Sequence, residues 1–182
     1  MKKLFVLPMV AAALALSGCG KNLGKEIDKE TFDAKAAEIA KKGLVAPKRV
    51  SAKGKIEAEG KKEDVNFDLA YEELDGNAVA KHVKELVFDY TISTIESMTS
   101  ASTYKRTFHY DEKADTIGIA FNGSVKESAA GMTYEESGEG KFAWNNYGLA
   151  TYMMLDQKMT MSAGGESETM KMFMEIDIVY TY

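Results

Sequence analysis

Residues 168–182 read ETMKMFMEIDIVYTY, and this stretch decides the fold class because two kinds of side chain alternate along it. One set of alternate positions is apolar or aromatic throughout: Met170, Met172, Met174, Ile176, Ile178, Tyr180 and Tyr182. The other set mixes charged residues such as Lys171 and Asp177 with Phe173 and Val179. A period of two is the pattern of a β-strand with one face against a core.

The segments that precede this strand repeat the pattern. Residues 150–162 are separated from it by the turn sequence AGGES, so the two are predicted to form a long terminal hairpin. Residues 104–110 and 116–121 flank a second turn, DEKAD, and are also predicted strands. Weaker strands are predicted at 132–136 and 141–144.

The N-terminal half contributes a second hairpin and two helices. Residues 30–42 carry apolar side chains at helical spacing, with Asp28 as a candidate N-cap. After Pro47 the period changes to two, and residues 50–58 and 65–71 are predicted to pair. Within residues 77–98 the pattern fits a helix of about four turns, although part of this segment also suits a strand.

Together these segments predict one α+β, mostly β domain over residues 29–182. Its sheet would be antiparallel, with seven to nine strands, and both helices would pack on one face. Such a wide sheet must twist and curl, which makes a half-barrel with a concave apolar interior. The residues that precede it, 19–28, are predicted to form a short flexible tether.

The chain begins with MKKLFVLPMVAAALALSGCG, the pattern of an export signal. Two lysines precede an apolar run that ends at Leu16, and this run is too short to span a bilayer about 30 Å thick. Residues 1–18 are therefore predicted to be a signal peptide, removed from the mature chain.

The end of this signal resembles the lipobox of bacterial lipoproteins: Leu16, Ser17, Gly18 and Cys19. The resemblance implies cleavage before Cys19 and alkylation of its thiol with a diacylglyceryl group, a lipid anchor of the palmitate type. The protein would then be lipid-anchored on the extracytoplasmic side of the cell membrane or outer membrane, because two acyl chains anchor stably. An ordinary cleaved signal with an incidental cysteine is the alternative.

Composition excludes several functional classes. Cys19 is the only cysteine, which rules out a disulfide or a thiolate metal cluster within one chain. A net charge of −5 argues against nucleic-acid binding, which needs a basic surface. Neither His82 nor His109 has a partner at metal-ligand spacing, so no metal or cofactor is predicted.

Catalytic motifs are absent from the sequence as well, and the chain is predicted not to be an enzyme. Three acidic pairs could in principle serve glycoside hydrolysis, but each lies near a predicted turn or strand end: Glu72-Glu73, Asp111-Glu112 and Glu135-Glu136. Four aromatic residues could form a stacking platform for sugar, with core packing as the simpler interpretation: Phe142, Trp144, Tyr147 and Tyr152.

The mature chain resembles the small envelope lipoproteins that share the fold of the localisation factors LolA and LolB and of mycobacterial LppX and LprG. The shared features are the lipobox, the early helix, the amphipathic strands after Pro47, a second helix between strands, and the aromatic-turn-aromatic segment 142–148. The resemblance covers most of residues 29–182. It implies a half-barrel that holds acyl chains in its concavity.

The methionines are the candidate ligand-binding residues, because the chain has eleven and the thioether suits an adaptable apolar pocket. The predicted pocket residues are Met159, Met161, Met170, Met172, Met174 and Trp144. Plain core packing and a Cu(I) site are the alternatives. We expect a non-enzymatic binding module for an apolar or lipid ligand. The alternative is an envelope scaffold or surface protein–protein interaction lipoprotein, whose protein partner is unknown.

Overall fold

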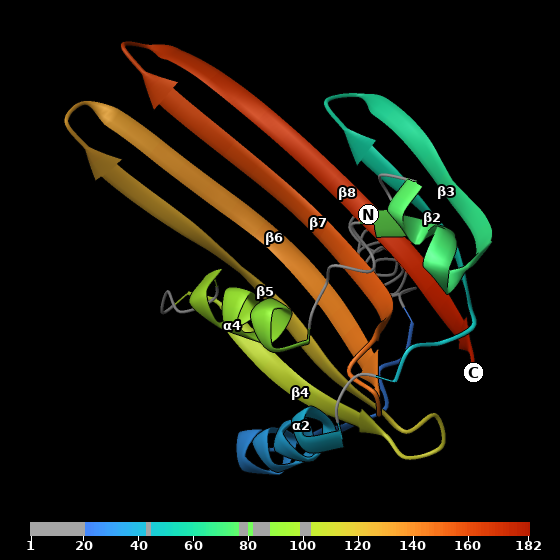
Figure 1. Cartoon of the computed structure of the whole chain (residues 1–182). Helices are drawn as coiled ribbons and strands as arrows, with labels where there is room; N and C mark the ends of the chain where they lie inside the picture. Colours follow the sequence, from blue (N-terminus) through green and yellow to red (C-terminus); the bar gives the residue numbers. More distant parts are fainter. Residues whose placement is uncertain (1–20, 43–44, 77–79, 82–87, 99–102) are drawn as a thin grey trace, which may run out of the picture.

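The computed structural model describes residues 21–42, 45–76, 80–81, 88–98 and 103–182 (Figure 1). They form an eight-stranded, wholly antiparallel sheet of order β1-β4-β5-β6-β7-β8-β2-β3. The strands are β1 (Lys25–Ile27), β2 (Arg49–Ala58), β3 (Lys61–Ala70), β4 (Lys105–Asp111), β5 (Thr116–Ala129), β6 (Met132–Asn145), β7 (Ala150–Ala163) and β8 (Glu166–Thr181). The sheet is curled and is not closed into a barrel, so the predicted fold class is confirmed.

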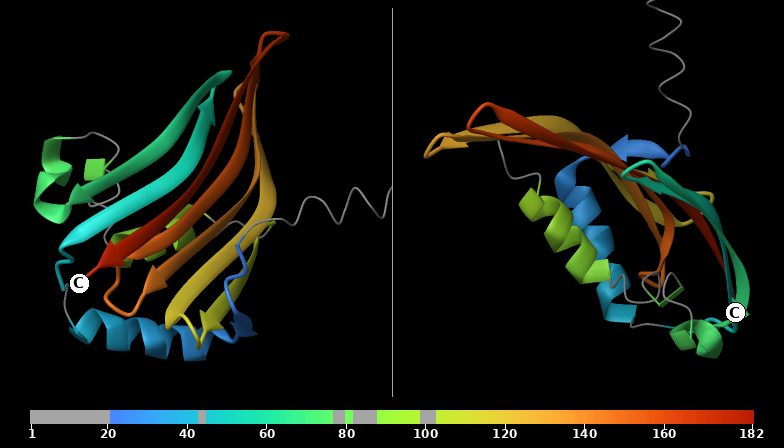
Figure 2. Two further views of the ribbon diagram at one scale, coloured as in Figure 1. Left: turned by 90° about the vertical axis from the view of Figure 1, so that its right-hand side faces the viewer. Right: turned by 90° about the horizontal axis from the view of Figure 1, so that it is seen from above.

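The helices lie on the concave side of this sheet, called the inner face below (Figure 2). They are α2 (Lys29–Lys42), the 3₁₀ helix η1 (Tyr71–Gly76) and α4 (Phe88–Met98). Asp28 caps α2 as predicted, because its Oδ1 accepts a hydrogen bond of 2.7 Å from the backbone N–H of Thr31. Of the predicted helix 77–98, residues 88–98 are confirmed, 80–81 are helical, and the remainder lies outside the described residues.

The main core lies between the helices and the inner face of the sheet. Phe32 of α2 is fully buried and its ring centroid lies 4.9 Å from that of Phe108 on β4. Ile95 of α4 joins the same cluster, together with Ile176 and Ile178 of β8. The alternation that decided the fold class in the sequence therefore places the last strand's isoleucines in the core.

The predicted strands 132–136 and 141–144 are one continuous strand, β6, and β5 extends well beyond residue 121. Glycines obscured this in the sequence, because they interrupt the apolar alternation without ending the strand. A Cβ at Gly140 would lie 2.4 Å from the ring of Phe121, and one at Gly123 would lie 2.7 Å from Tyr104 Cα. The glycines thus leave room for neighbouring aromatic residues on the inner face.

The segment predicted to be a flexible tether is instead docked on the sheet from residue 21 onward. Lys25–Ile27 form β1 and pair with β4. Leu23 is buried on the outer face, in a small cluster with Ala143, Tyr152 and Met154. With a single buried leucine in this segment, the sequence offered too little apolar pattern to predict the contact.

Strands β5 to β8 project beyond the rest of the sheet (Figure 1). The pairing of β4 with β5 ends at Asn122, and that of β2 with β8 ends at Met172. Beyond these points only the four strands continue, and we call this part the distal extension: residues 123–129, 132–138, 157–163 and 166–171. The sheet, the helices and both apolar clusters lie within residues 21–182, so a chain without the first 20 residues contains every described element.

Candidate functional site

The inner face of the distal extension carries methionine on three adjacent strands. The register of the terminal hairpin places Met159 of β7 opposite Met170 of β8. Met161 lies opposite Tyr134 of β6 and Met132 opposite Ala163 of β7. Because successive residues of a strand point to opposite faces, all these side chains share one surface.

This methionine surface is open to solvent. Met132, Met161 and Met170 are 60%, 57% and 40% exposed. Nearer the core, Met159, Met172 and Met174 are half-buried, and the last two lie opposite Gln157 and Leu155 instead of other methionines. Apolar side chains this exposed on neighbouring strands form a continuous patch, which is typical of a binding surface.

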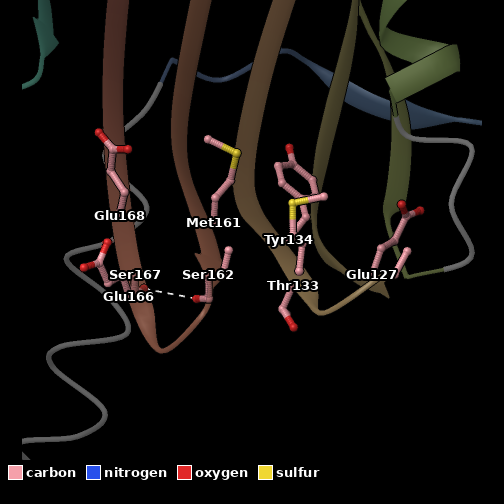
Figure 3. A pocket seen from close by; sticks show the side chains of 11 residues that line it. Glu127, Thr133, Tyr134, Met161, Ser162, Glu166, Ser167 and Glu168 are labelled. Atoms are coloured by element: carbon pink, nitrogen blue, oxygen red, sulfur yellow. Dashed lines mark hydrogen bonds between the residues drawn. The ribbon is translucent and has the colours of Figure 1, made fainter.

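A pocket of about 500 Å³ lies at the tip of the distal extension (Figure 3). Met132, Met161 and Tyr134 provide most of its apolar lining, with Ala129 and Ala163 beside them. Three carboxylates stand around it: Glu127, Glu166 and Glu168. The volume lies within the range of small-molecule sites.

Of the predicted pocket residues, only Met161 lines this pocket, while Met159, Met170, Met172 and Met174 continue the same surface toward the core. Sequence reasoning missed Met132 and Tyr134. Their M-x-Y spacing predicted a strand, but nothing in the sequence showed that this strand pairs with β7. The strand order was the missing information.

A carboxylate with three hydrogen-bond donors lies within the methionine surface. Glu136 lies opposite Met159 in the register. Its Oε1 accepts hydrogen bonds from the hydroxyl of Tyr104 at 3.2 Å and from Nε2 of Gln157 at 2.7 Å, and its Oε2 accepts one from the hydroxyl of Tyr134. Such charge-assisted bonds hold the side chains in place.

Both tyrosines of this cluster resist ionisation. Burial, followed by the charge of Glu136 and its hydrogen bond, raises the pKa of Tyr104 to about 12. The hydrogen bond to Glu136, followed by burial and the same charge, raises the pKa of Tyr134 to about 12. A phenolate next to a carboxylate is disfavoured, so both hydroxyls remain donors at neutral pH.

The four aromatic residues do not form a stacking platform, and core packing, the simpler interpretation, holds for Phe142, Trp144 and Tyr152. Trp144 is fully buried in the core, where its ring stacks with Phe142 at 6.2 Å, so it belongs to the core and does not line the pocket. Tyr152 is buried on the outer face, and Tyr147 packs on Tyr182 at 4.7 Å. The alternation along each strand separates residues that are close in sequence.

The other candidate residues are also dispersed. His109 lies 2.9 Å from Thr107 Oγ1 through Nε2, and His82 lies outside the described residues. Glu135 and Glu136 point to opposite faces, since Glu135 pairs with Lys126 on the outer face. In the part of the chain that the structure describes, no three His, Cys, Asp or Glu residues gather as metal ligands. No helix in that part is long and apolar enough to cross a membrane.

Comparisons of the chain with protein-family models, with curated proteins and with solved structures find no significant match. The lipobox and the resemblance to half-barrel lipoproteins therefore stay predictions. The described residues themselves provide an open methionine surface, an acid-rimmed pocket and a hydrogen-bonded glutamate.

Replacing Glu136 by Gln tests the electrostatic coupling in this cluster. We expect the pKa of Tyr134 to fall from about 12 toward its ordinary value of 10.0, because its hydrogen bond to a carboxylate and the negative charge of that carboxylate are both removed. The pKa of Tyr104 should fall less, since burial is its main cause. NMR titration of tyrosine ring carbons measures both. With folded-state pKa values raised, these phenols stabilise the fold fully below about pH 10 and lose that contribution as pH rises through about 12.

The matched control is Glu135→Gln, which removes one negative charge from the adjacent residue but on the outer face. It should leave the pKa of Tyr134 unchanged. A Tyr134 pKa that stays near 12 in Glu136→Gln would contradict the assigned cause.

Proposed function

We propose that the protein is a lipid-anchored, extracytoplasmic, non-enzymatic module that shelters an apolar ligand, such as an acyl chain, on the methionine surface of the distal extension. The observation that carries this proposal is the exposure of Met132, Met161 and Met170 on the inner face of the distal extension, whose outer face is polar. Burying apolar area from water is favourable by about 25 cal/mol per Å². A ligand that covers this surface therefore gains binding energy.

The two faces of the distal extension differ in the way expected for a one-sided binding surface. On its outer face hydroxyl pairs cross between strands, with 3.1 Å between Thr160 and Thr169 and 3.2 Å between Ser162 and Ser167. The inner face instead offers flexible thioethers, which adapt to apolar ligands of irregular shape. The polar outer face is therefore suited to contact with solvent, and the apolar inner face is suited to contact with a ligand.

The docked N-terminal segment supports an anchor on the outer side of the sheet. Nζ of Lys21 lies 2.6 Å from Oδ1 of Asp177, and the backbone N–H of Lys21 donates a hydrogen bond of 3.4 Å to the hydroxyl of Tyr152. Two residues of chain span at most about 7 Å, so a lipid on Cys19 would hold the outer face toward the membrane. The methionine surface would then face away from it.

The free strand edges of the distal extension favour a second candidate function. In the described residues β5 has no paired strand on one side beyond Asn122, and β8 has none beyond Met172. Unpaired edges are templates for strand addition by another chain. The protein would then be an envelope scaffold whose partner pairs with an edge.

Lipidation is tested by following the full chain in bacterial cells. The wild-type chain should incorporate an alkyne-tagged fatty acid and sediment with membranes, because Cys19 supplies the thiol. Cys19→Ser should do neither, whereas Ser17→Ala keeps a small residue before the cysteine and should be modified normally. Labelling that persists in Cys19→Ser would exclude the anchor proposed here.

The orientation of the anchored protein is tested with introduced cysteines, since lipidation consumes the only natural thiol. We expect a fluorophore at Val179→Cys, on the outer face beside Asp177, to be quenched by nitroxide lipids in the vesicles that carry the protein. One at Met132→Cys, on the inner face, should stay bright. Both positions are about 60% exposed (62% and 60%), so access by the label is matched. Equal quenching at the two sites would disprove the orientation.

The ligand surface is tested with Met132→Gln combined with Met161→Gln, in a chain of residues 21–182. Binding of the apolar dye phenylnaphthylamine should weaken about tenfold, because two lining side chains become polar. Stability in urea should change by less than about 0.5 kcal/mol, since both side chains are mostly exposed. Val179→Gln is the matched control on the outer face and should bind the dye normally.

Unchanged dye binding in the double variant would contradict the proposal that Met132 and Met161 line the binding site. It would favour the scaffold function, because strand addition depends on backbone groups and not on the methionines.

A further inference from the structure

Charge is sorted between the two faces of β5 to β8. At inner-face positions these strands carry four glutamates and neither lysine nor arginine: Glu127, Glu136, Glu166 and Glu168. Their four lysines all occupy outer-face positions: Lys126, Lys141, Lys158 and Lys171. All residues of these strands are described, so the separation holds along their whole length.

Among the described residues, no ion pair neutralises the carboxylates of the inner face. No ion pair among the described residues includes Glu127, Glu166 or Glu168. Glu136 is held by two tyrosines and a glutamine, which are neutral donors. On the outer face, by contrast, Lys126 pairs with Glu135 and Lys55 with Glu175. The inner face therefore presents uncompensated negative charge around an apolar surface.

We propose that the pocket selects amphiphiles with a positively charged head, and that its natural ligand is an alkyl or acyl chain that bears an ammonium group. This inference rests on the proposed function and names the class of its ligand. The methionines would contact the chain, while Glu127, Glu166 and Glu168 would surround the head. Tyr134 lines the same pocket, and an aromatic ring attracts a cation over its face.

The size of the pocket favours a small amphiphile over a folded partner. About 500 Å³ suits a single small molecule, whereas an α-helix with its side chains is about 10–12 Å wide. Interactions of exposed charges are individually weak and are screened by salt. Three carboxylates around one cation should together give a preference of about tenfold, and this preference should fall at high salt.

The test compares three amphiphiles with the same twelve-carbon chain, each below its micelle concentration: dodecyltrimethylammonium, dodecyl maltoside and dodecanoate. Isothermal titration calorimetry uses the chain of residues 21–182, after cooperative unfolding has been verified. We expect the cation to bind about tenfold more tightly than the neutral probe, and the anion to bind more weakly than both.

The decisive variant replaces Glu127, Glu166 and Glu168 by Gln. It should bind the cation no more tightly than the neutral probe, because the charges that distinguish the two head groups are gone. Its matched control removes three charges from the outer face, by Glu135→Gln, Glu139→Gln and Asp156→Asn, and should keep the wild-type preference.

The outcomes separate the inference from the function on which it rests. If all three probes bind the wild type equally, the charge selection is wrong and apolar binding stands. If the preference for the cation survives in the inner-face variant, the carboxylates do not cause it and the inference is overturned. If no probe binds, the proposed binding function fails as well.

Discussion

The structure depends on the alternation of side chains along strands that are longer than the helices packed on them. A strand of 14 residues, such as β5, spans about 46 Å at roughly 3.3 Å per residue. The 14 residues of α2 span only about 21 Å at 1.5 Å each. The helices therefore cover only part of the inner face. The methionine surface lies on the distal extension, which the helices do not reach.

The same alternation explains how far the sequence could predict the fold. The terminal hairpin, the β2–β3 hairpin and α2 follow from local periodicity and local pairing, and all three are confirmed. The position of β2 beside β8 was not predictable, because it joins segments more than 100 residues apart, such as Val50 and Tyr180. The length of β6 was hidden by Gly138 and Gly140, which carry no side chain to continue the pattern.

The candidate site, like the fold, could be predicted from the sequence only in part. The opposition of Met159 and Met170 followed from the hairpin turn, whereas the contribution of β6 needed the strand order. The sequence of residues 21–24 has no apolar periodicity that could predict their docking. The contact rests on the buried side chain of Leu23 and on the ion pair of Lys21 with Asp177. That contact nevertheless distinguishes the two faces, because the N-terminal segment packs on the outer face and leaves the methionine surface of the inner face uncovered.

The inner-face glutamates also have a simpler physical interpretation, which is protection of an open apolar sheet against aggregation. Charged side chains of either sign serve that purpose, and lysine is the more usual choice at sheet edges. Protection alone therefore does not explain why all four lysines of β5 to β8 lie on the opposite face. Nor does it explain Glu136, whose carboxylate is fixed by three donors within the methionine surface instead of at a free edge. The sign and the placement of these charges are what a cationic ligand requires, and solubility requires neither.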